Sequence, residues 1–158
     1  MIPLFKKLQD EKLLKDRGYL LDLGGGNGRL SEPFLRYGYK ISLIDSNKDV
    51  LEEAKKNLGE IGNGKNFELI NQEIENFKFL HKYDGVIMSN VLPFQKDKEM
   101  VSKIIESAFN SLNDKGFLFL TLFSFIFMFF SLATRKFFRK KMQGKDLPGF
   151  LKKMLHLW

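Results

Sequence analysis

A cluster of four glycines, at positions 24, 25, 26 and 28, constrains this chain more than any other feature. The residues before it, Tyr19–Leu23, are apolar apart from Asp22 and predict a short buried strand. Clustered glycines suit neither a strand nor a helix, so they predict a tight turn, after which Arg29–Tyr37 can form a helix. Strand, glycine turn and helix in this order are typical of sites where backbone N–H groups and a helix N-terminus face a ligand, which a Cβ would obstruct.

The spacing of these glycines excludes two common nucleotide-binding motifs. A dinucleotide fingerprint would need a glycine where Arg29 stands, and a P-loop would need Lys and Ser or Thr directly after Gly28. The sequence instead has an acid two residues before alternating glycines, Asp22-x-Gly24-x-Gly26-x-Gly28. A carboxylate in this place suits a cationic ligand and would repel a pyrophosphate.

Three more strands are predicted before residue 90. Tyr39–Asp45 ends in an acid, and an acid at the end of the second strand of such a unit can accept hydrogen bonds from both ribose hydroxyls. Ser46 and Asp49 resemble a capping box that begins a helix ending near residues 59–64. Phe67–Asn71 and Tyr83–Ser89 are the third and fourth strands.

The elements around this centre complete an α/β pattern. Leu4–Asp16 is a weak helix candidate that would cover the cofactor cleft or one sheet edge. Lys96–Leu112 has the apolar spacing of an amphipathic helix, and Phe117–Leu122 follows it as a fifth strand after the turn at 113–116. Alternating strands and helices predict a doubly wound, mainly parallel sheet whose ligand site lies at the carboxyl ends of the strands.

The chain resembles the class I, Rossmann-like S-adenosylmethionine-dependent methyltransferases over roughly Gly18 to Leu122. The resemblance rests on the acid and alternating glycines, on Asp45, and on a fourth strand that starts with an aromatic residue and Asp84. It implies S-adenosylmethionine as cofactor, with Asp22 near the methionine ammonium and Asp45 on the ribose. The cofactor residues that it implies are Asp22, Gly24, Gly25, Gly26, Asn27, Gly28, Asp45, Ser46, Glu73, Ile74, Ser89 and Asn90.

The last four residues of this set, Glu73, Ile74, Ser89 and Asn90, are placed less directly than the glycine turn and Asp45. Glu73 and Ile74 fall where the family has an acid for the adenine amino group and an apolar neighbour, but a register slip or a plain solvated turn stays open. Ser89 and Asn90 would lie nearest the methyl-transfer site. The stretch to Phe94 is not the Asn/Asp-Pro-Pro-aromatic signature of enzymes that methylate adenine or amide nitrogens. No residue is identifiable as a catalytic base.

The last part of the chain departs from the family. Class I methyltransferases continue to a sixth and an antiparallel seventh strand, whereas residues 123–158 read as a Phe-rich, basic helical tail broken at Pro148 and Gly149. We therefore expect three parts: an N-terminal helix at 1–17, a cofactor-binding core at 18–122 without the last two strands, and this tail at 123–158. The chain would be a shortened or split enzyme, or the front part of a longer coding sequence.

Charge is distributed unevenly. Of the 26 Lys and Arg and 19 Asp and Glu, eight basic residues and one acidic residue follow Ala133, so the chain before them has no net charge. Three roles for the tail stay open: packing over the sheet and the active site, docking on an anionic membrane surface, or a membrane span. Gly116–Thr134 is uncharged, but its first third is needed for the fifth strand.

Composition limits the remaining possibilities. Without cysteine there are neither disulfides nor thiolate metal sites, and His81 and His156 stand too far apart in sequence to suggest a metal cluster. Met1–Arg17 lacks the apolar core of a signal peptide, so we expect a cytoplasmic protein, with peripheral membrane contact as an open alternative.

Methyl transfer to a small or lipid-linked acceptor is the function that these observations favour. The alternative is an inactive cofactor-binding module that acts on a partner or membrane through its tail. An RNA methyltransferase ranks lower, because no appended RNA-binding domain is visible, and we therefore expect no nucleic-acid partner.

Overall fold

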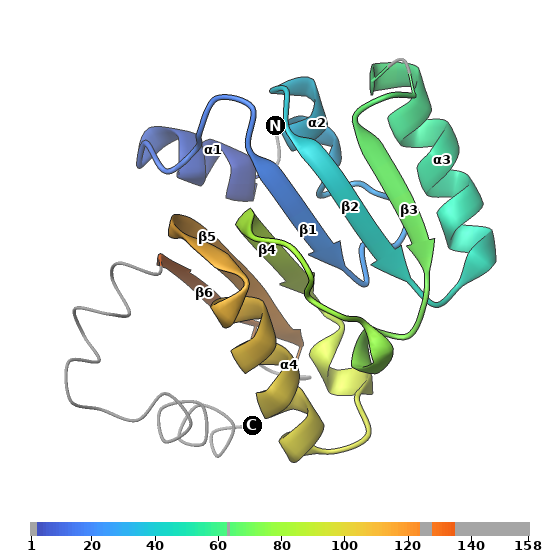
Figure 1. Ribbon diagram of the computed structural model, residues 1–158, viewed down its shortest axis with the longest axis vertical. Helices are drawn as coiled ribbons and strands as arrows, with labels where there is room; N and C mark the ends of the chain where they lie inside the picture. The colour runs from blue at the N-terminus through green and yellow to red at the C-terminus, as the bar shows by residue number, and fades with distance from the viewer. Residues whose placement is uncertain (1–2, 63, 124–127, 135–158) are drawn as a thin grey trace.

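A six-stranded sheet is the centre of the computed structural model, which describes residues 3–62, 64–123 and 128–134 (Figure 1). The strands lie in the order β3-β2-β1-β4-β5-β6; β1 to β5 are parallel, and β6 runs antiparallel to β5. Their bounds are β1 Tyr19–Leu23, β2 Lys40–Asp45, β3 Phe67–Asn71, β4 Tyr83–Ser89, β5 Leu112–Phe123 and β6 Met128–Thr134. This arrangement confirms the predicted doubly wound, mainly parallel sheet.

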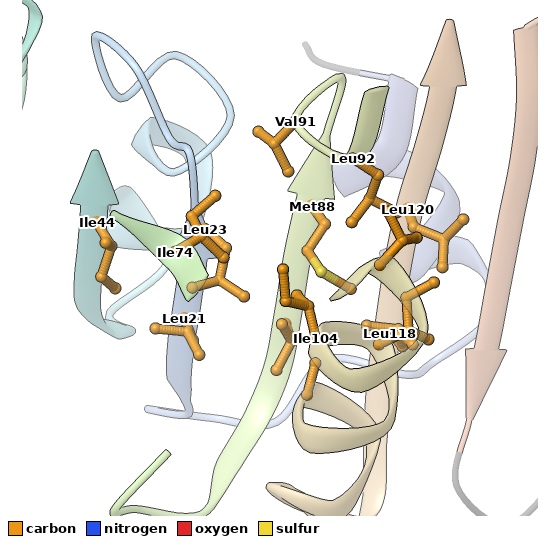
Figure 2. Close-up of a cluster of buried hydrophobic side chains, with 14 of the residues drawn as sticks. Leu21, Leu23, Ile44, Ile74, Met88, Val91, Leu92, Ile104, Leu118 and Leu120 are labelled. Carbon is orange, nitrogen blue, oxygen red and sulfur yellow. The ribbon is translucent and has the colours of Figure 1, made fainter. Parts of the chain in front are cut away.

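Helices cover both faces of the sheet. One core holds α1 (Pro3–Asp10), α2 (Glu32–Arg36) and α3 (Lys48–Gly62) against the sheet. The other core holds α4 (Lys98–Asn110) together with Ile74 and Leu92 of two short 3₁₀ helices, η1 (Ile74–Asn76) and η2 (Leu92–Phe94) (Figure 2). Strands β1, β2 and β4 are buried at most of their positions, on both faces, which is why their central residues are mainly apolar; Asp22 and Ser42 are buried polar exceptions.

The N-terminal helix is shorter than predicted and does not lie over the cofactor cleft. It ends at Asp10 because Lys12 takes a left-handed conformation, with φ of 54°, and the Leu13 N–H donates to the Leu8 carbonyl at 2.9 Å. Leu4, Phe5 and Leu8 are buried in the core shared with α2. The helix therefore covers the sheet face on the side of α2.

The helix after the glycine turn also starts later than predicted. It begins at Glu32, with Pro33 in its first turn, and it ends at Arg36. Gly38 follows the C-cap residue Tyr37, and its φ of 98° confirms the expected glycine stop. The next helix is capped by a residue that we did not choose. Asn47 Oδ1, rather than the Ser46 side chain, accepts from the N–H groups of Asp49 and Val50, at 2.9 and 3.3 Å.

The Phe-rich segment after the fifth strand is the main error in the predicted fold. Residues 128–134 form strand β6, paired from Phe123 with Met128 to Phe117 with Thr134, where we expected helix. An uncharged run of this length does not distinguish helix from strand, and phenylalanine favours strands. The few residues between β5 and β6 also suit antiparallel pairing, because a parallel pair needs a long crossover. The rest of the predicted tail helix, 135–158, lies outside the described residues.

Candidate functional site

The carboxyl ends of β1, β2 and β4 bring the predicted site residues together. Leu23, the last residue of β1, pairs with Ile44 of β2 on one side and with Met88 of β4 on the other. The residues that follow these three positions are Gly24, Asp45 and Ser89, so the glycine turn lies between the ends of its two neighbours. This is the sheet edge at which ligands bind in folds of this kind.

Three of the four glycines are required by the protein's own packing. A Cβ at Gly24 would overlap Val91 Cγ1, one at Gly25 would lie 2.5 Å from Leu43 Cγ, and one at Gly28 would lie 3.0 Å from Leu58 Cδ1. Gly24 and Gly28 also have φ of 65° and 79°, which side chains disfavour. The protein's own packing is therefore a sufficient reason for glycine at these three positions.

Gly26 is the exception, and it faces open space. A Cβ there would meet only Val50 Cγ1, at 3.8 Å, among the described residues. Its N–H donates to Asp45 Oδ2 at 3.0 Å, while Asp45 Oδ1 accepts from the Asn47 N–H at 2.9 Å. The Asp45 carboxylate is thus held beside the single glycine of the turn that leaves room for a ligand to approach the backbone.

Asp22 is a buried acid whose negative charge is stabilised by few neighbouring groups. Its side chain is 1 % exposed, and its oxygen Oδ2 accepts from Ser31 Oγ at 2.7 Å. Burial raises the pKa of Asp22 from 3.8 to about 6; Ser31 partly opposes this shift, and the charge of Asp45 adds to it. Among the described residues no Lys, Arg or His forms an ion pair with Asp22 or Asp45. Two neighbouring acids without a cation favour a cationic ligand.

The pair predicted for adenine is divided by the structure. Ile74 is 8 % exposed and packs under the turn, with its Cδ1 3.4 Å from the Cβ position of Gly24. Glu73 lies one residue before the short helix η1 with an exposed side chain. Figure 2 shows Ile74 and Leu23 side by side at this edge. Ile74 therefore contributes to the floor of the site and Glu73 to its rim.

A hydroxyl network at the ends of β4 and β5 was not predicted. Thr121, which pairs with Ser89 across the sheet, has its oxygen Oγ1 3.0 Å from Ser89 Oγ. The same oxygen accepts from the Asn90 N–H and donates to Asn90 Oδ1, both at 3.1 Å. Asn90 has a φ of 59°, which asparagine tolerates better than most residues. Thr121 could have been identified as the single polar residue between Phe117 and Phe123.

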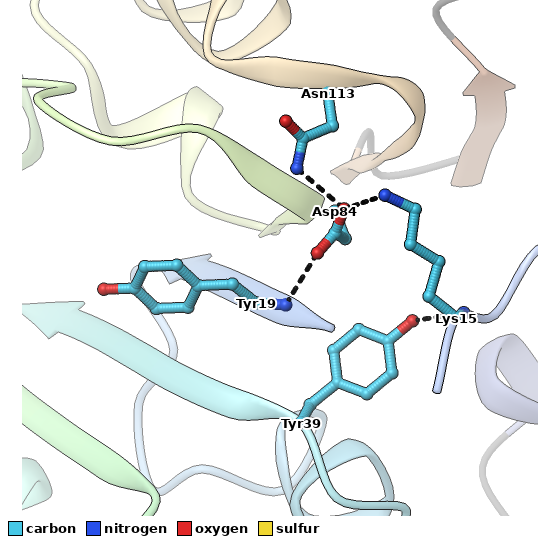
Figure 3. A network of polar contacts seen from close by, with 5 residues as sticks. All are labelled: Lys15, Tyr19, Tyr39, Asp84 and Asn113. Atoms are coloured by element: carbon cyan, nitrogen blue, oxygen red, sulfur yellow. Dashed lines mark hydrogen bonds and ion pairs between the residues drawn. The ribbon is translucent and has the colours of Figure 1, made fainter. Parts of the chain in front are cut away.

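A second polar cluster lies at the opposite, amino ends of the strands (Figure 3). Asp84 accepts from Lys15 Nζ at 2.5 Å, from the Tyr19 N–H at 3.0 Å and from Asn113 Nδ2 at 2.7 Å. These donors hold the pKa of Asp84 below its usual value, although partial burial opposes them more strongly than any single donor favours the charge. Asp84 joins the segment before β1 to the starts of β1 and β5.

Comparison with known proteins gives a consistent match. A family model described as a methyltransferase domain matches residues 20–116. A probable cobalt-precorrin-6B C(15)-methyltransferase (decarboxylating) from Methanobrevibacter smithii is 31 % identical over 102 residues, which cover 65 % of this chain and 52 % of the relative. The chain thus spans about half the length of this curated relative.

Solved structures share the fold. A methyltransferase dependent on S-adenosylmethionine from Clostridium acetobutylicum has a TM-score of 0.64 at 24 % identity, covering 77 % of this chain and 48 % of that one. A second, from Geobacter sulfurreducens in complex with S-adenosyl-L-homocysteine, has a TM-score of 0.64 at 20 % identity over the same shares. With the family match, they confirm the resemblance to a methyltransferase domain and the fold that it implies.

Proposed function

Because the chain belongs to the methyltransferase-domain family, we propose that it transfers a methyl group from S-adenosylmethionine to a small or lipid-linked acceptor. One observation carries this proposal: Gly26 is open beside an acid at the carboxyl edge of the sheet. The curated relative, whose name gives a cobalt-precorrin as its acceptor, supports a small molecule in that role here.

The residues present fit this cofactor. Asp45 would accept hydrogen bonds from the ribose hydroxyls, and Gly26 would let the backbone approach the ribose and methionine portions. Asp22 forms no ion pair with any described Lys, Arg or His. From beneath the turn, its carboxylate would attract the positively charged methionine ammonium. Ile74 and Glu73 would border the adenine ring.

The bound cofactor would supply an electrophilic methyl carbon on a positively charged sulfur. The chain's own contribution is to hold the acceptor in line with that carbon and to exclude water. Ser89 and Asn90 lie at the end of β4, next to the turn that bears Gly24, because Val91 packs against this glycine. These two residues would therefore orient the acceptor.

A titration series tests the first half of the proposal. Isothermal calorimetry of the full chain should show binding of S-adenosylmethionine and S-adenosylhomocysteine and no binding of NAD or ATP. An absence of heat with the first two ligands, or tight binding of NAD, would end the proposal.

Transfer of a labelled methyl group tests the second half. Labelled S-adenosylmethionine is incubated with the chain and with separate lipid, small-metabolite and RNA extracts. Label in the lipid or metabolite fraction supports the proposal, label in RNA contradicts the assigned acceptor class, and binding without any label identifies an inactive cofactor-binding module.

Membrane contact through the end of the chain stays a separate proposal. Residues 135–158 hold the excess positive charge, and each Lys or Arg near an anionic surface contributes about 1 kcal/mol, reduced by salt. Vesicles with acidic lipid should bind the chain in a salt-sensitive way, whereas equal binding without acidic lipid would contradict the proposal. No helix in the described ranges is long and apolar enough to cross a bilayer.

A further inference from the structure

The hydrogen-bond directions around Thr121 can be worked out from its chemistry. A hydroxyl group has one hydrogen to donate and two lone pairs to accept with. Thr121 Oγ1 donates its hydrogen to Asn90 Oδ1 and accepts from the Asn90 N–H. Its contact with Ser89 Oγ, at 3.0 Å, must therefore be one in which Ser89 donates. Thr121 is 5 % exposed, so water does not compete freely for these bonds.

This arrangement leaves two complementary groups at the end of β4. Ser89 uses its hydrogen on Thr121 and keeps its lone pairs as acceptors. Asn90 uses its carbonyl oxygen on Thr121 and keeps the two hydrogens of Nδ2, which have no hydrogen-bond partner among the described residues. Ser89 is partly exposed and Asn90 is exposed, so a bound molecule can reach both. One acceptor and one donor thus stand on consecutive residues.

The end of β4 is also placed against the cofactor side of the site. Val91, directly after Asn90, fills the space beside Gly24 and is 9 % exposed. The Asn90 N–H donates both to Thr121 Oγ1 and to the Thr121 carbonyl oxygen, the latter with an N to O distance of 3.3 Å. These contacts hold Asn90 in its left-handed conformation. Both Thr121 groups therefore fix the backbone that carries the donor and the acceptor.

We propose that Thr121 is a positioning residue that makes Ser89 an acceptor and Asn90 a donor toward a methyl acceptor bearing a hydroxyl group. This inference rests on the proposed function. A hydroxyl can donate to Ser89, accept from Asn90 and still have a lone pair free to attack a methyl carbon. A neutral amine that accepts from Asn90 has used its single lone pair, and a carbon nucleophile offers neither contact.

The reaction balances with such an acceptor. The acceptor oxygen forms the new bond to the methyl carbon while the bond from that carbon to sulfur breaks. Sulfur keeps the electron pair and becomes neutral. After the transfer the former hydroxyl proton leaves the product oxygen for bulk solvent, which reaches the partly exposed Ser89. Ser89 and Asn90 orient the oxygen and need not take up the proton.

Two small probes test the inference without a methylation assay. The full chain, ¹⁵N-labelled and saturated with S-adenosylhomocysteine, is titrated with phenol and with anisole, which has no hydroxyl hydrogen. Phenol should shift the Asn90 side-chain amide signals saturably and bind about fivefold or more tightly than anisole, the effect of one hydrogen bond. Equal binding of the two probes, or no saturable shift with phenol, overturns the inference.

Two substitutions at Thr121 separate positioning from folding. Thr121→Val keeps the shape and removes the hydroxyl, so the preference for phenol should fall to within about twofold, while Thr121→Ser should retain it. Both variants should bind S-adenosylhomocysteine as the parent does. An unchanged phenol preference in Thr121→Val, or lost cofactor binding in that variant, contradicts the assigned role. If Thr121→Val does not fold, Ser89→Ala should lose the same preference, and its retention there overturns the inference. A parent that does not bind S-adenosylhomocysteine instead refutes the proposed function.

Discussion

Two aspartates on adjacent strands, Asp22 on β1 and Asp84 on β4, show how differently the two edges of this sheet are built. Asp84, at the amino edge, has three donors including a lysine, and its pKa is lowered (Figure 3). Asp22, at the carboxyl edge, is more deeply buried, accepts from Ser31 alone among the described residues, and has a raised pKa. The amino edge is satisfied internally, whereas the carboxyl edge is left to be completed by a ligand.

Positive φ values occur at both edges and do not repeat this contrast. Gly24, Gly26, Gly28 and Asn90 have them at the carboxyl edge, and Arg17 and Gly38 have them just before β1 and β2, at the amino edge. The contrast lies in how the two aspartates are satisfied. Changes to the polar groups of the amino edge should therefore affect stability alone, and changes to those of the carboxyl edge should affect ligand binding.

The largest expected effect is a loss of stability on substitution of Gly24, in the glycine turn. Gly24→Ala combines a left-handed alanine with an overlap on Val91, and it should lower the free energy of unfolding by about 3–5 kcal/mol. Gly59→Ala, in α3, is the matched control: its Cβ meets no described atom within 4 Å, and it should stabilise by about 0.5–1 kcal/mol. Urea unfolding measures the stability of both variants. If Gly24→Ala is as stable as Gly59→Ala, the turn is not packed as described.

Asp45→Ala should give the largest loss of affinity. It removes the acceptor of two ribose hydroxyls and releases the Gly26 and Asn47 N–H groups. Binding of S-adenosylmethionine should weaken by about 3 kcal/mol, roughly 100-fold, in a calorimetric titration. Parent-like affinity in this variant would make Asp45 an ordinary loop acid.

Asp22 should make stability depend on pH in the opposite sense to an ion-paired acid. Its pKa is about 6 in the folded chain against 3.8 without burial, so the folded state binds more protons between these values. Relative to Asp22→Asn, the parent should therefore lose about 2–3 kcal/mol of stability as pH rises from 4 to 7. Urea unfolding of both proteins across this range measures the difference, and parallel profiles would contradict the burial of a charged Asp22.

Asp84→Asn should have the smallest effect, and it should lower stability without changing cofactor affinity. It weakens the contacts to the Tyr19 N–H and Asn113, and the partner Lys15 is half exposed, so its ion pair contributes little. Stability should fall by about 1–2 kcal/mol while the affinity for S-adenosylmethionine stays within twofold of the parent. A larger loss of affinity would break the distinction between the two edges.

Most of the fold could be predicted because parallel strands and their helices leave strong patterns. Short, mainly apolar segments marked β1 to β4, although β3, at the edge of the sheet, is only partly buried, and glycines such as Gly38 marked helix ends. The strand β6 was missed because an uncharged run has no periodicity that separates a strand from a helix, and the preference of phenylalanine for strands was given too little weight. The bounds of α1 were missed because Lys12 adopts a conformation that its residue type does not signal.

The position of the site could be predicted from the sequence, but the contacts that explain its residues could not. Asp22, the glycine turn and Asp45 lie together as expected, but no sequence pattern says that Gly24 makes room for Val91 and Gly26 for a ligand. Thr121 and Asn47 act through contacts with residues on a neighbouring strand or at the start of a helix. Such contacts become visible only when the strands are placed in register.

The central claim is that S-adenosylmethionine lies against Gly26, and one titration tests it directly. Gly26→Ala places its Cβ in open space, so it should cost only about 1–2 kcal/mol of stability, from the left-handed backbone. The same Cβ would stand where the cofactor approaches, and calorimetric affinity for S-adenosylmethionine should fall more than about tenfold, while Gly59→Ala binds as the parent does. A folded Gly26→Ala that binds S-adenosylmethionine within twofold of the parent would contradict the account.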